Sequence, residues 1–244
     1  MDAHRQTPWD LRLEWGLTGA REVAGRADVA VVVDVLSFTT TLSVAADLGT
    51  RVVPCDVRGD AAALAARHGG VVASGREARD GRPSLSPASL RVAPPVETLV
   101  LPSPNGSAIS AALALAGCVV VGACLRNASA VAEWVATQTP GVVAVVPAGE
   151  RWPDGGLRPA VEDLWGAGAV VDALARAGYD PSPEADVARR SHGAVAGRVA
   201  AALGACASGR ELDAAGFAAD VAIAAEADAS RAVPVLHDGV FAPA

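Results

Sequence analysis

The hydrophobic positions of this chain fall into short Val-rich runs that alternate with longer Ala-rich segments. The Val-rich runs are β-branched and apolar without strict alternation, which is typical of strands covered on both faces. We expect strands at 28–36, 51–57, 70–74, 97–102, 118–123 and 142–148. Helical patterns between and after them predict helices at 39–48, 59–68, 107–116, 127–138 and 160–177. This alternation predicts an α/β fold with a largely parallel sheet between two helical layers.

Two regions do not follow this alternation of strand and helix patterns. The segment 74–97 is rich in Pro, Ser and Arg, and so long a connection in a compact domain is usually functional or mobile. After Pro181 the pattern is helical only, over about 183–203 and 210–227, and a last extended piece at 232–241 predicts an edge strand or a surface wrap. We expect one domain over 1–244, with two closely packed lobes, 1–97 and 98–244, as the alternative division.

Composition and charge exclude several classes of function. The chain has 244 residues, is 51% hydrophobic and carries a net charge of −7 with scattered arginines, which argues against a nucleic-acid partner. No apolar run approaches the ~20 residues that span a membrane, and the polar start is not a signal peptide. No two of the four cysteines have the C-x-x-C spacing of a metal or redox site, so we expect reduced, buried thiols and a cytoplasmic protein.

The first cluster of candidate chemistry follows the strand at 28–36. Asp34 ends a wholly apolar run, where a carboxylate is costly unless it has a partner. Ser37, Thr39 and Thr40 then open a helix, and hydroxyls beside free N–H groups suit an anion site. The alternative is a helix cap by Ser37 and an internally paired Asp34.

Three further strand-to-helix junctions carry polar residues. The second offers Ser103, Asn105, Gly106 and Ser107, as an oxyanion loop or as an ordinary turn. The third has Arg126 and Asn127, as an anion-binding pair or as a surface arginine and a helix cap. The fourth places Glu162 and Asp163 in a first helical turn, where they either complement the helix dipole or bind a cation.

These junctions predict one cleft if their strands run parallel, because ligands of open α/β sheets bind beyond the carboxyl ends of the strands. Asp163 lies on the apolar face of its helix, so we expect it to bind Mg²⁺ together with Asp34. Such a cleft suits metal-assisted displacement at phosphorus. A glycine-rich dinucleotide or Walker A loop is not present in the sequence, which argues against NAD and ATP.

Common phosphatase motifs do not fit. Leu36 stands where a haloacid-dehalogenase-type site needs a second Asp. Arg67-His68-Gly69 follows a helix, whereas a histidine phosphatase has this triplet after its first strand. No Cys is followed by Arg at the spacing of a cysteine-phosphatase loop.

Together the junctions resemble the 2-phosphosulfolactate phosphatase family. VVVDVLSFTTT, LPSPNGSAIS, GACLRNASAVA and PAGE…VEDLWGAG match its segments in order, and the tail has its Gly-Phe-x-x-Asp followed by Val-Pro. The resemblance spans about residues 28–240. It implies Mg²⁺-dependent hydrolysis of (2R)-2-phospho-3-sulfolactate in the coenzyme M route, a three-layer α/β/α fold with a parallel or mixed sheet, and a homodimer as one assembly that the family allows.

The resemblance also assigns residues. It implies catalytic roles for Asp34, Glu162 and Asp163, with Asp34 and Asp163 at the metal. The substrate-binding candidates, from the resemblance and the junctions together, are Ser37, Thr39, Thr40, Ser103, Asn105, Gly106, Ser107, Arg126 and Asn127. Ser37 stands where the family usually has Arg, which removes a positive charge. The alternatives are therefore a different phosphate ester as substrate and a non-enzymatic binder of a phosphorylated metabolite.

Overall fold

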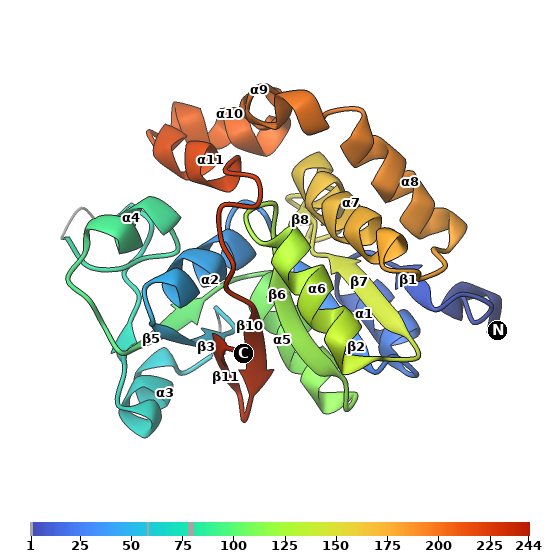
Figure 1. Cartoon of the computed structure of the whole chain (residues 1–244). Helices are drawn as coiled ribbons and strands as arrows, with labels where there is room; N and C mark the ends of the chain where they lie inside the picture. The colour runs from blue at the N-terminus through green and yellow to red at the C-terminus, as the bar shows by residue number, and fades with distance from the viewer. Residues whose placement is uncertain (1, 58, 78–80) are drawn as a thin grey trace.

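The computed structural model describes residues 2–57, 59–77 and 81–244, and it is an α/β protein with helices on both faces of one large mixed sheet (Figure 1). The expected fold class is confirmed. The nine strands of the sheet have the order β1-β7-β2-β6-β10-β11-β3-β5-β4. None of the helices within the described ranges has the length and apolar character to cross a lipid bilayer.

Four parallel strands form one side of the sheet: β1 (Leu11–Leu13), β7 (Val143–Pro147), β2 (Val29–Val33) and β6 (Val119–Ala123). All five residues of β2 are buried because helices cover both of its faces. Val29, Val31 and Val33 pack in one core cluster, and Ala30 and Val32 pack in the other. The period of two in β2 therefore supplies both helical layers with apolar contacts.

The other side of the sheet has three parallel strands, and the C-terminal hairpin joins the two sides. The three strands are β3 (Arg51–Cys55), β5 (Thr98–Pro102) and β4 (Val71–Val72). The hairpin of β10 (Pro234–His237) and β11 (Val240–Pro243) pairs antiparallel with β6 through β10 and with β3 through β11. The prediction of an edge strand or a surface wrap was wrong, because Val235 and Phe241 are buried in the middle of the sheet.

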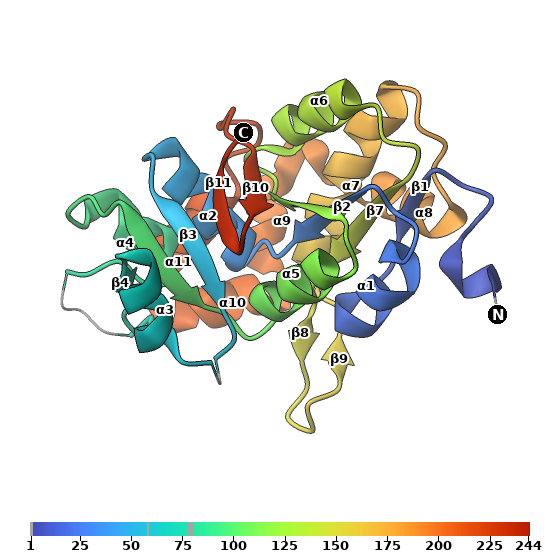
Figure 2. The same ribbon diagram turned by 90° about the horizontal axis from the view of Figure 1, so that it is seen from below.

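The hairpin also changes the expected geometry of the strand ends. Its antiparallel pairs set β3 and β5 against the direction of β6, so β5 does not belong to the parallel group of β2, β6 and β7. Figure 2 shows β3 steeply inclined to β2. The loop that follows β5 nevertheless reaches the end of β2, where Gly106 contacts Asp34.

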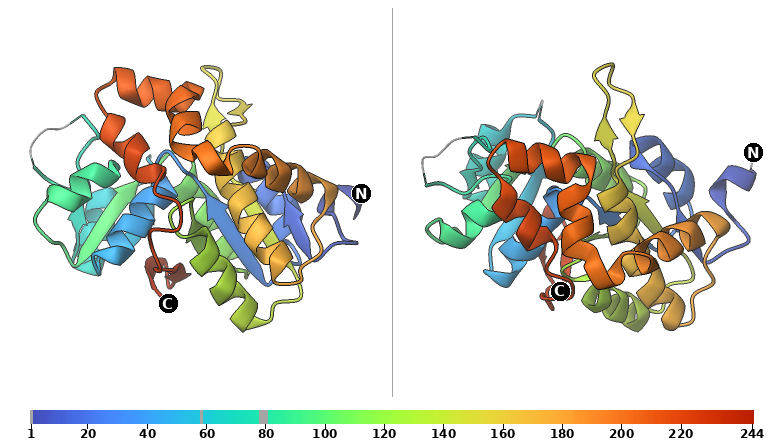
Figure 3. Two further views of the ribbon diagram at one scale, coloured as in Figure 1. Left: turned by 45° about the horizontal axis from the view of Figure 1, so that its top comes forward. Right: turned by 90° about the horizontal axis from the view of Figure 1, so that it is seen from above.

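The helices occupy two layers and a cover. The main helices are α1 (Gly16–Ala24), α2 (Phe38–Asp47), α3 (Ala61–His68), α5 (Gly106–Leu115), α6 (Ala128–Gln138) and α7 (Val161–Arg176). The remaining helical segments are η1 (Asp2–Arg5), α4 (Pro87–Val92), α8 (Pro183–Gly193), η2 (Ala196–Arg198), α9 (Val199–Ala205), α10 (Ala207–Ala214) and α11 (Ala218–Ala224). Figure 3 shows α9, α10 and α11 as a compact group over one end of the sheet.

The sequence pattern missed or merged several elements. The two long helices expected after Pro181 are four short ones, because Ala-Gly-rich segments end them and Cys206 opens α10 by accepting the Gly209 N–H at its sulfur. Neither α1 nor α4 was predicted. Nor was the small hairpin of β8 (Glu150–Arg151) and β9 (Leu157–Arg158), which projects from the body of the molecule (Figure 2).

Candidate active site

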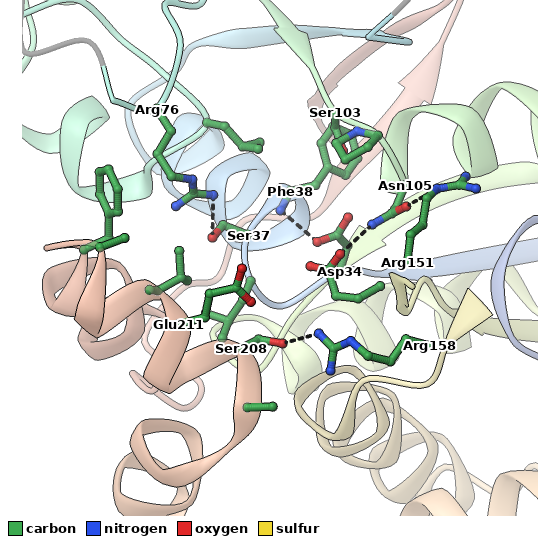
Figure 4. A pocket seen from close by; sticks show the side chains of 18 of the residues that line it. Asp34, Ser37, Phe38, Arg76, Ser103, Asn105, Arg151, Arg158, Ser208 and Glu211 are labelled. Carbon is green, nitrogen blue, oxygen red and sulfur yellow. Dashed lines mark hydrogen bonds between the residues drawn. The ribbon is translucent and has the colours of Figure 1, made fainter. Parts of the chain in front are cut away.

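A cavity of about 590 Å³ lies where the turn after β2 meets four other segments (Figure 4). These segments are the connection 74–97, the loop after β5, the β8–β9 hairpin, and α10 with the turn that leads to α11. Its charged lining residues are Asp34, Arg76, Glu77, Glu150, Arg151, Arg158 and Glu211. The cavity therefore combines carboxylates and guanidinium groups from distant parts of the chain.

Asp34 occupies the end of β2 and is 8% exposed. Its carboxylate accepts the Phe38 N–H at 3.1 Å and the Gly106 N–H at 3.1 Å. Burial raises the pKa of Asp34 to about 6, although both backbone donors and the positive charge of Arg76 act in the opposite direction. Each carboxylate oxygen keeps a lone pair after these contacts, so Asp34 can still bind a cation or a proton.

The threonines at the start of α2 stabilise this turn. The Thr39 hydroxyl donates to the Asp34 carbonyl at 2.8 Å and accepts the Asp34 N–H at 2.9 Å, and the Thr40 hydroxyl donates to the Val35 carbonyl at 2.7 Å. Both side chains are fully buried. The two threonine hydroxyls stabilise the backbone turn that carries Asp34. We expected these hydroxyls to face a bound oxyanion, but in the structure they bond to backbone groups.

The loop after β5 contributes Ser103 and Asn105 to the cavity. The Asn105 amide donates to Glu150 Oε2 at 3.2 Å, and its oxygen accepts Arg151 Nε at 3.1 Å. Ser107 does not line the cavity, because its hydroxyl lies 3.4 Å from the Leu101 carbonyl that accepts its proton.

Gly106 contributes its backbone alone. A Cβ atom at this position would lie 2.2 Å from Phe38 Cδ1 and 3.0 Å from Asp34 Oδ2. Only glycine lets the first turn of α5 approach Asp34 closely enough to donate its N–H.

Glu150 is a carboxylate of the cavity that the sequence motifs did not single out as a site residue. It begins β8 and pairs directly across the small hairpin with Arg158. Burial, with the negative charges of Asp34 and Glu162, raises its pKa to about 7, against the charge of Arg158 and the Asn105 hydrogen bond. Two carboxyl groups with raised pKa values thus share one cavity, which is a common property of functional sites.

The three arginines of the cavity were not among the predicted site residues. Arg76 comes from the connection 74–97, and its Nη2 donates to the Ser37 hydroxyl at 3.0 Å. Arg158 donates to the Ser208 hydroxyl at 3.0 Å and lies over the Trp152 ring, with Cζ 5.8 Å from its centroid. Figure 4 shows Arg76 and Ser37 on one side of the cavity and Arg151 and Arg158 on the other, with Asp34 between them.

The two acidic residues of α7 lie behind the cavity. Asp163 is 3% exposed and accepts the Val35 N–H at 2.7 Å and the Gly149 N–H at 2.8 Å, so it ties the turn after β2 to the turn after β7. Burial and the charges of Asp34 and Glu162 raise the pKa of Asp163 well above its usual range. Glu162 is 2% exposed and accepts the Cys206 thiol at 3.5 Å.

Neither α7 residue lines the cavity. The role of Asp163 as a metal ligand beside Asp34 stays a prediction, and the contacts that the structure gives its carboxylate hold two backbone turns. Glu162 contributes its charge from behind the cavity rather than a ligand atom within it.

Arg126 and Asn127 also lie outside the cavity. Arg126 is buried, pairs with Asp47 at 3.0 Å and Glu226 at 3.1 Å, and joins α2 to the C-terminal segment. The Asn127 side-chain oxygen accepts the Cys124 N–H, and its amide donates to the Ala232 carbonyl at 3.0 Å. The structure thus replaces the expected substrate contacts with structural ones, because the end of β6 faces the C-terminal hairpin.

The model of the 2-phosphosulpholactate phosphatase family matches residues 19–239 of the chain. The chain belongs to this family. Membership identifies it as a phosphatase of phosphoric monoesters. No curated protein matches the sequence.

Two carboxylates of this phosphatase's cavity, Asp34 and Glu150, offer the oxygen ligands that Mg²⁺ prefers. The described residues contain no group of three His, Cys, Asp or Glu side chains that could enclose a metal ion. Mg²⁺ is commonly held by one or two carboxylates together with substrate phosphate and water, so Asp34 and Glu150 fit such a site. The described lining residues include four carboxylates and three arginines, and a divalent cation beside Asp34 and Glu150 would reduce the repulsion between their ionised forms and an anionic ester.

A positive charge stands beside Ser37, the position where the family usually has an arginine. The Arg76 guanidinium reaches the Ser37 hydroxyl, so a positive charge from another segment stands next to this position. A phosphate or a second acidic group can therefore still find an arginine on this side of the cavity.

Proposed function

We propose that this phosphatase hydrolyses a small, multiply acidic phosphate ester with the help of Mg²⁺, and that the ester is (2R)-2-phospho-3-sulfolactate. The observation that carries the proposal is the set of three arginines around Asp34 and Glu150 in one cavity. The ester carries a phosphate, a carboxylate and a sulfonate, and guanidinium groups are suited to each of these anions. Family membership supports the phosphatase chemistry.

In this proposal Asp34 and Glu150 hold the cation. Mg²⁺ supplies charge neutralisation on the phosphoryl oxygens and a fixed orientation for the ester. Arg151 and Arg158 lie on the cavity side away from Arg76 and bind and orient phosphoryl oxygens. The Asn105 side chain hydrogen-bonds to both Glu150 and Arg151 and so fixes their relative positions. Positioning and electrostatic stabilisation of this kind provide most of the catalysis in phosphoryl transfer.

The setting of the reaction follows from the same proposal. The four cysteines are free and buried. This arrangement supports a reducing cytoplasm as the place where the ester is hydrolysed, with sulfolactate and phosphate as products. A step of coenzyme M biosynthesis is the corresponding role.

Phosphate release from purified protein tests the proposal. The substrates are (2R)-2-phospho-3-sulfolactate and a panel of simple phosphate esters, each with Mg²⁺ and with a chelator. We expect metal-dependent turnover that is fastest on the sulfonated ester, and a loss of at least about 100-fold in Asp34→Asn, since the cation site loses its buried charge. Glu97→Gln, an exposed substitution, is the matched control.

Absence of turnover on every ester would overturn the proposal and leave a protein that binds a phosphorylated metabolite without hydrolysing it. Undiminished turnover in the chelator would contradict the metal requirement alone. Full activity of Asp34→Asn would show that the chemistry takes place elsewhere.

A further inference from the structure

Arg76 is held at the cavity by the C-terminal helices. Its Nη1 donates to Asp220 Oδ2 at 2.6 Å, and its Cζ lies 5.5 Å from the centre of the Phe217 ring. Its Nη2 donates to Ser37 at 3.0 Å. The side chain is 18% exposed and lines the cavity, so its guanidinium is fixed on three sides and open on one.

Asp220 uses its whole carboxylate within the protein. It is 1% exposed and does not line the cavity. Besides Arg76, it accepts the Ser86 hydroxyl at 2.5 Å and the Ala88 N–H at 3.1 Å. Asp220 therefore joins α11 to the first turn of α4 and to Arg76, and a buried carboxylate with this many donors fixes the geometry of its partners.

Among the described residues, Arg76 has hydrogen-bond partners for only part of its guanidinium, which faces the cavity. A guanidinium has five N–H donors, and the two hydrogen bonds to Asp220 and Ser37 use two of them. Arg151 and Arg158 lie on the opposite side of the cavity, with Asp34 in between (Figure 4). In the proposed function the phosphate lies with Arg151 and Arg158, and this leaves Arg76 to meet a different part of the ester.

We infer that Arg76 binds an acidic group of the substrate other than the phosphate, and that Asp220 is the residue that positions Arg76 for this contact. Arg76 is then a specificity-determining residue that selects phosphate esters with a second strongly acidic group, here the sulfonate. This inference rests on the proposed function, because it assigns another part of the same substrate.

The experiment compares two esters on four single variants. The esters are 2-phospho-3-sulfolactate and 2-phospholactate, which has hydrogen in place of the sulfonate. The variants are Arg76→Gln, Asp220→Asn, Phe217→Leu and the control Arg91→Gln, which removes an arginine of α4 that pairs with Glu226 outside the cavity. The double variant of Arg76→Gln with Asp220→Asn is measured as well.

We expect Arg76→Gln to lower kcat/KM for the sulfonated ester by about 10- to 100-fold, mainly through KM, because a charge-assisted contact is lost. The change for 2-phospholactate is below about threefold. Asp220→Asn lowers the same preference, and it adds nothing in the Arg76→Gln background because its effect acts through Arg76. Phe217→Leu shows a smaller loss, about 2- to 10-fold, of the same kind, and Arg91→Gln shows none.

Equal losses on both esters in Arg76→Gln would overturn the assignment of Arg76. Additive losses in the double variant would overturn the positioning role of Asp220. If the wild-type protein hydrolyses neither ester, the proposed function fails, and calorimetric binding of sulfolactate and lactate then tests the inference by itself. Wild-type protein should prefer sulfolactate and Arg76→Gln should not; the same preference in both would refute it.

Discussion

Replacement of Glu150 by Gln should make the metal-free protein more stable at pH 8 and change its stability much less at pH 5. A carboxyl group whose pKa is higher in the folded protein than in the unfolded chain binds its proton more tightly when folded. The folded protein therefore loses stability as the pH rises from about 4.5 through about 7, and the full penalty is present at pH 8. Gln carries no charge and avoids this penalty at every pH.

The magnitude follows from the pKa of Glu150. A rise from 4.5 to about 7 corresponds to roughly 3 kcal/mol at about 1.4 kcal/mol for each pH unit. Because Glu150 is partly exposed, solvent screening reduces this to about 1–2 kcal/mol. The Gln side-chain oxygen can keep the hydrogen bond from Asn105, so little is lost in return.

Thermal unfolding in a chelator at pH 5 and pH 8 measures the effect. A change of 1–2 kcal/mol corresponds to an increase in Tm of about 2–8 °C for a chain of this size. Glu133→Gln, an exposed substitution, should show no comparable dependence on pH. Mg²⁺ should raise the Tm of the wild type at pH 8 and raise that of Glu150→Gln less. An equal or lower Tm of the metal-free Gln variant at pH 8 would refute the reasoning.

Three further substitutions separate structural from catalytic roles. Asp163→Asn should lower the free energy of unfolding by about 2–4 kcal/mol, measured by denaturant unfolding, because one of two buried backbone donors loses its acceptor; an unchanged stability would contradict its structural role. Arg126→Gln should lower the Tm but leave KM unchanged in steady-state kinetics, since Arg126 lies outside the cavity, and a raised KM would return it to the substrate site. Gly106→Ala should reduce kcat at least about tenfold in a phosphate-release assay, because the added methyl group displaces Phe38 and the adjoining carboxylate; wild-type kcat would show that this close approach is dispensable.

The sequence predicts the elements around β2 well because its signals are local. An apolar strand that ends in a carboxylate identifies Asp34 as an unusual residue, and the structure places it in the cavity. The three threonines of α2 are unusual for the same reason, yet their hydroxyls bond to backbone carbonyls. A run of polar residues at a helix start thus indicates a special turn without showing whether the backbone or a ligand uses the hydroxyls.

The C-terminal hairpin carried a local signal that a strand-by-strand interpretation overlooked. Asp238-Gly239 separates two apolar runs, and both residues have positive φ, 49° and 80°. An Asp-Gly pair between such runs is a strong indication of a two-residue hairpin turn. Its place in the middle of the sheet has no local signal, because it depends on the gap between β6 and β3.

The arginines of the cavity could not be predicted from their surroundings in the chain. Arg76, Arg151 and Arg158 stand in polar segments, where an arginine usually belongs to the solvated surface. Their role arises when the connection 74–97 and the β8–β9 hairpin fold towards Asp34. The sequence likewise favoured Asp163 over Glu150: both follow β7, and in the folded chain Glu150 lines the cavity while Asp163 accepts the Gly149 N–H.

The last part of the chain completes both the core and the cavity, and this links stability to specificity. The hairpin of β10 and β11 is the sole link between the two sides of the described sheet. Helix α10 and the turn that follows it line one side of the cavity, and Asp220 of α11 holds Arg76. A substitution that loosens the C-terminal helices should therefore reduce discrimination between esters before it unfolds the protein, because Arg76 depends on Asp220 while Asp34 is held by β2, α2 and α5.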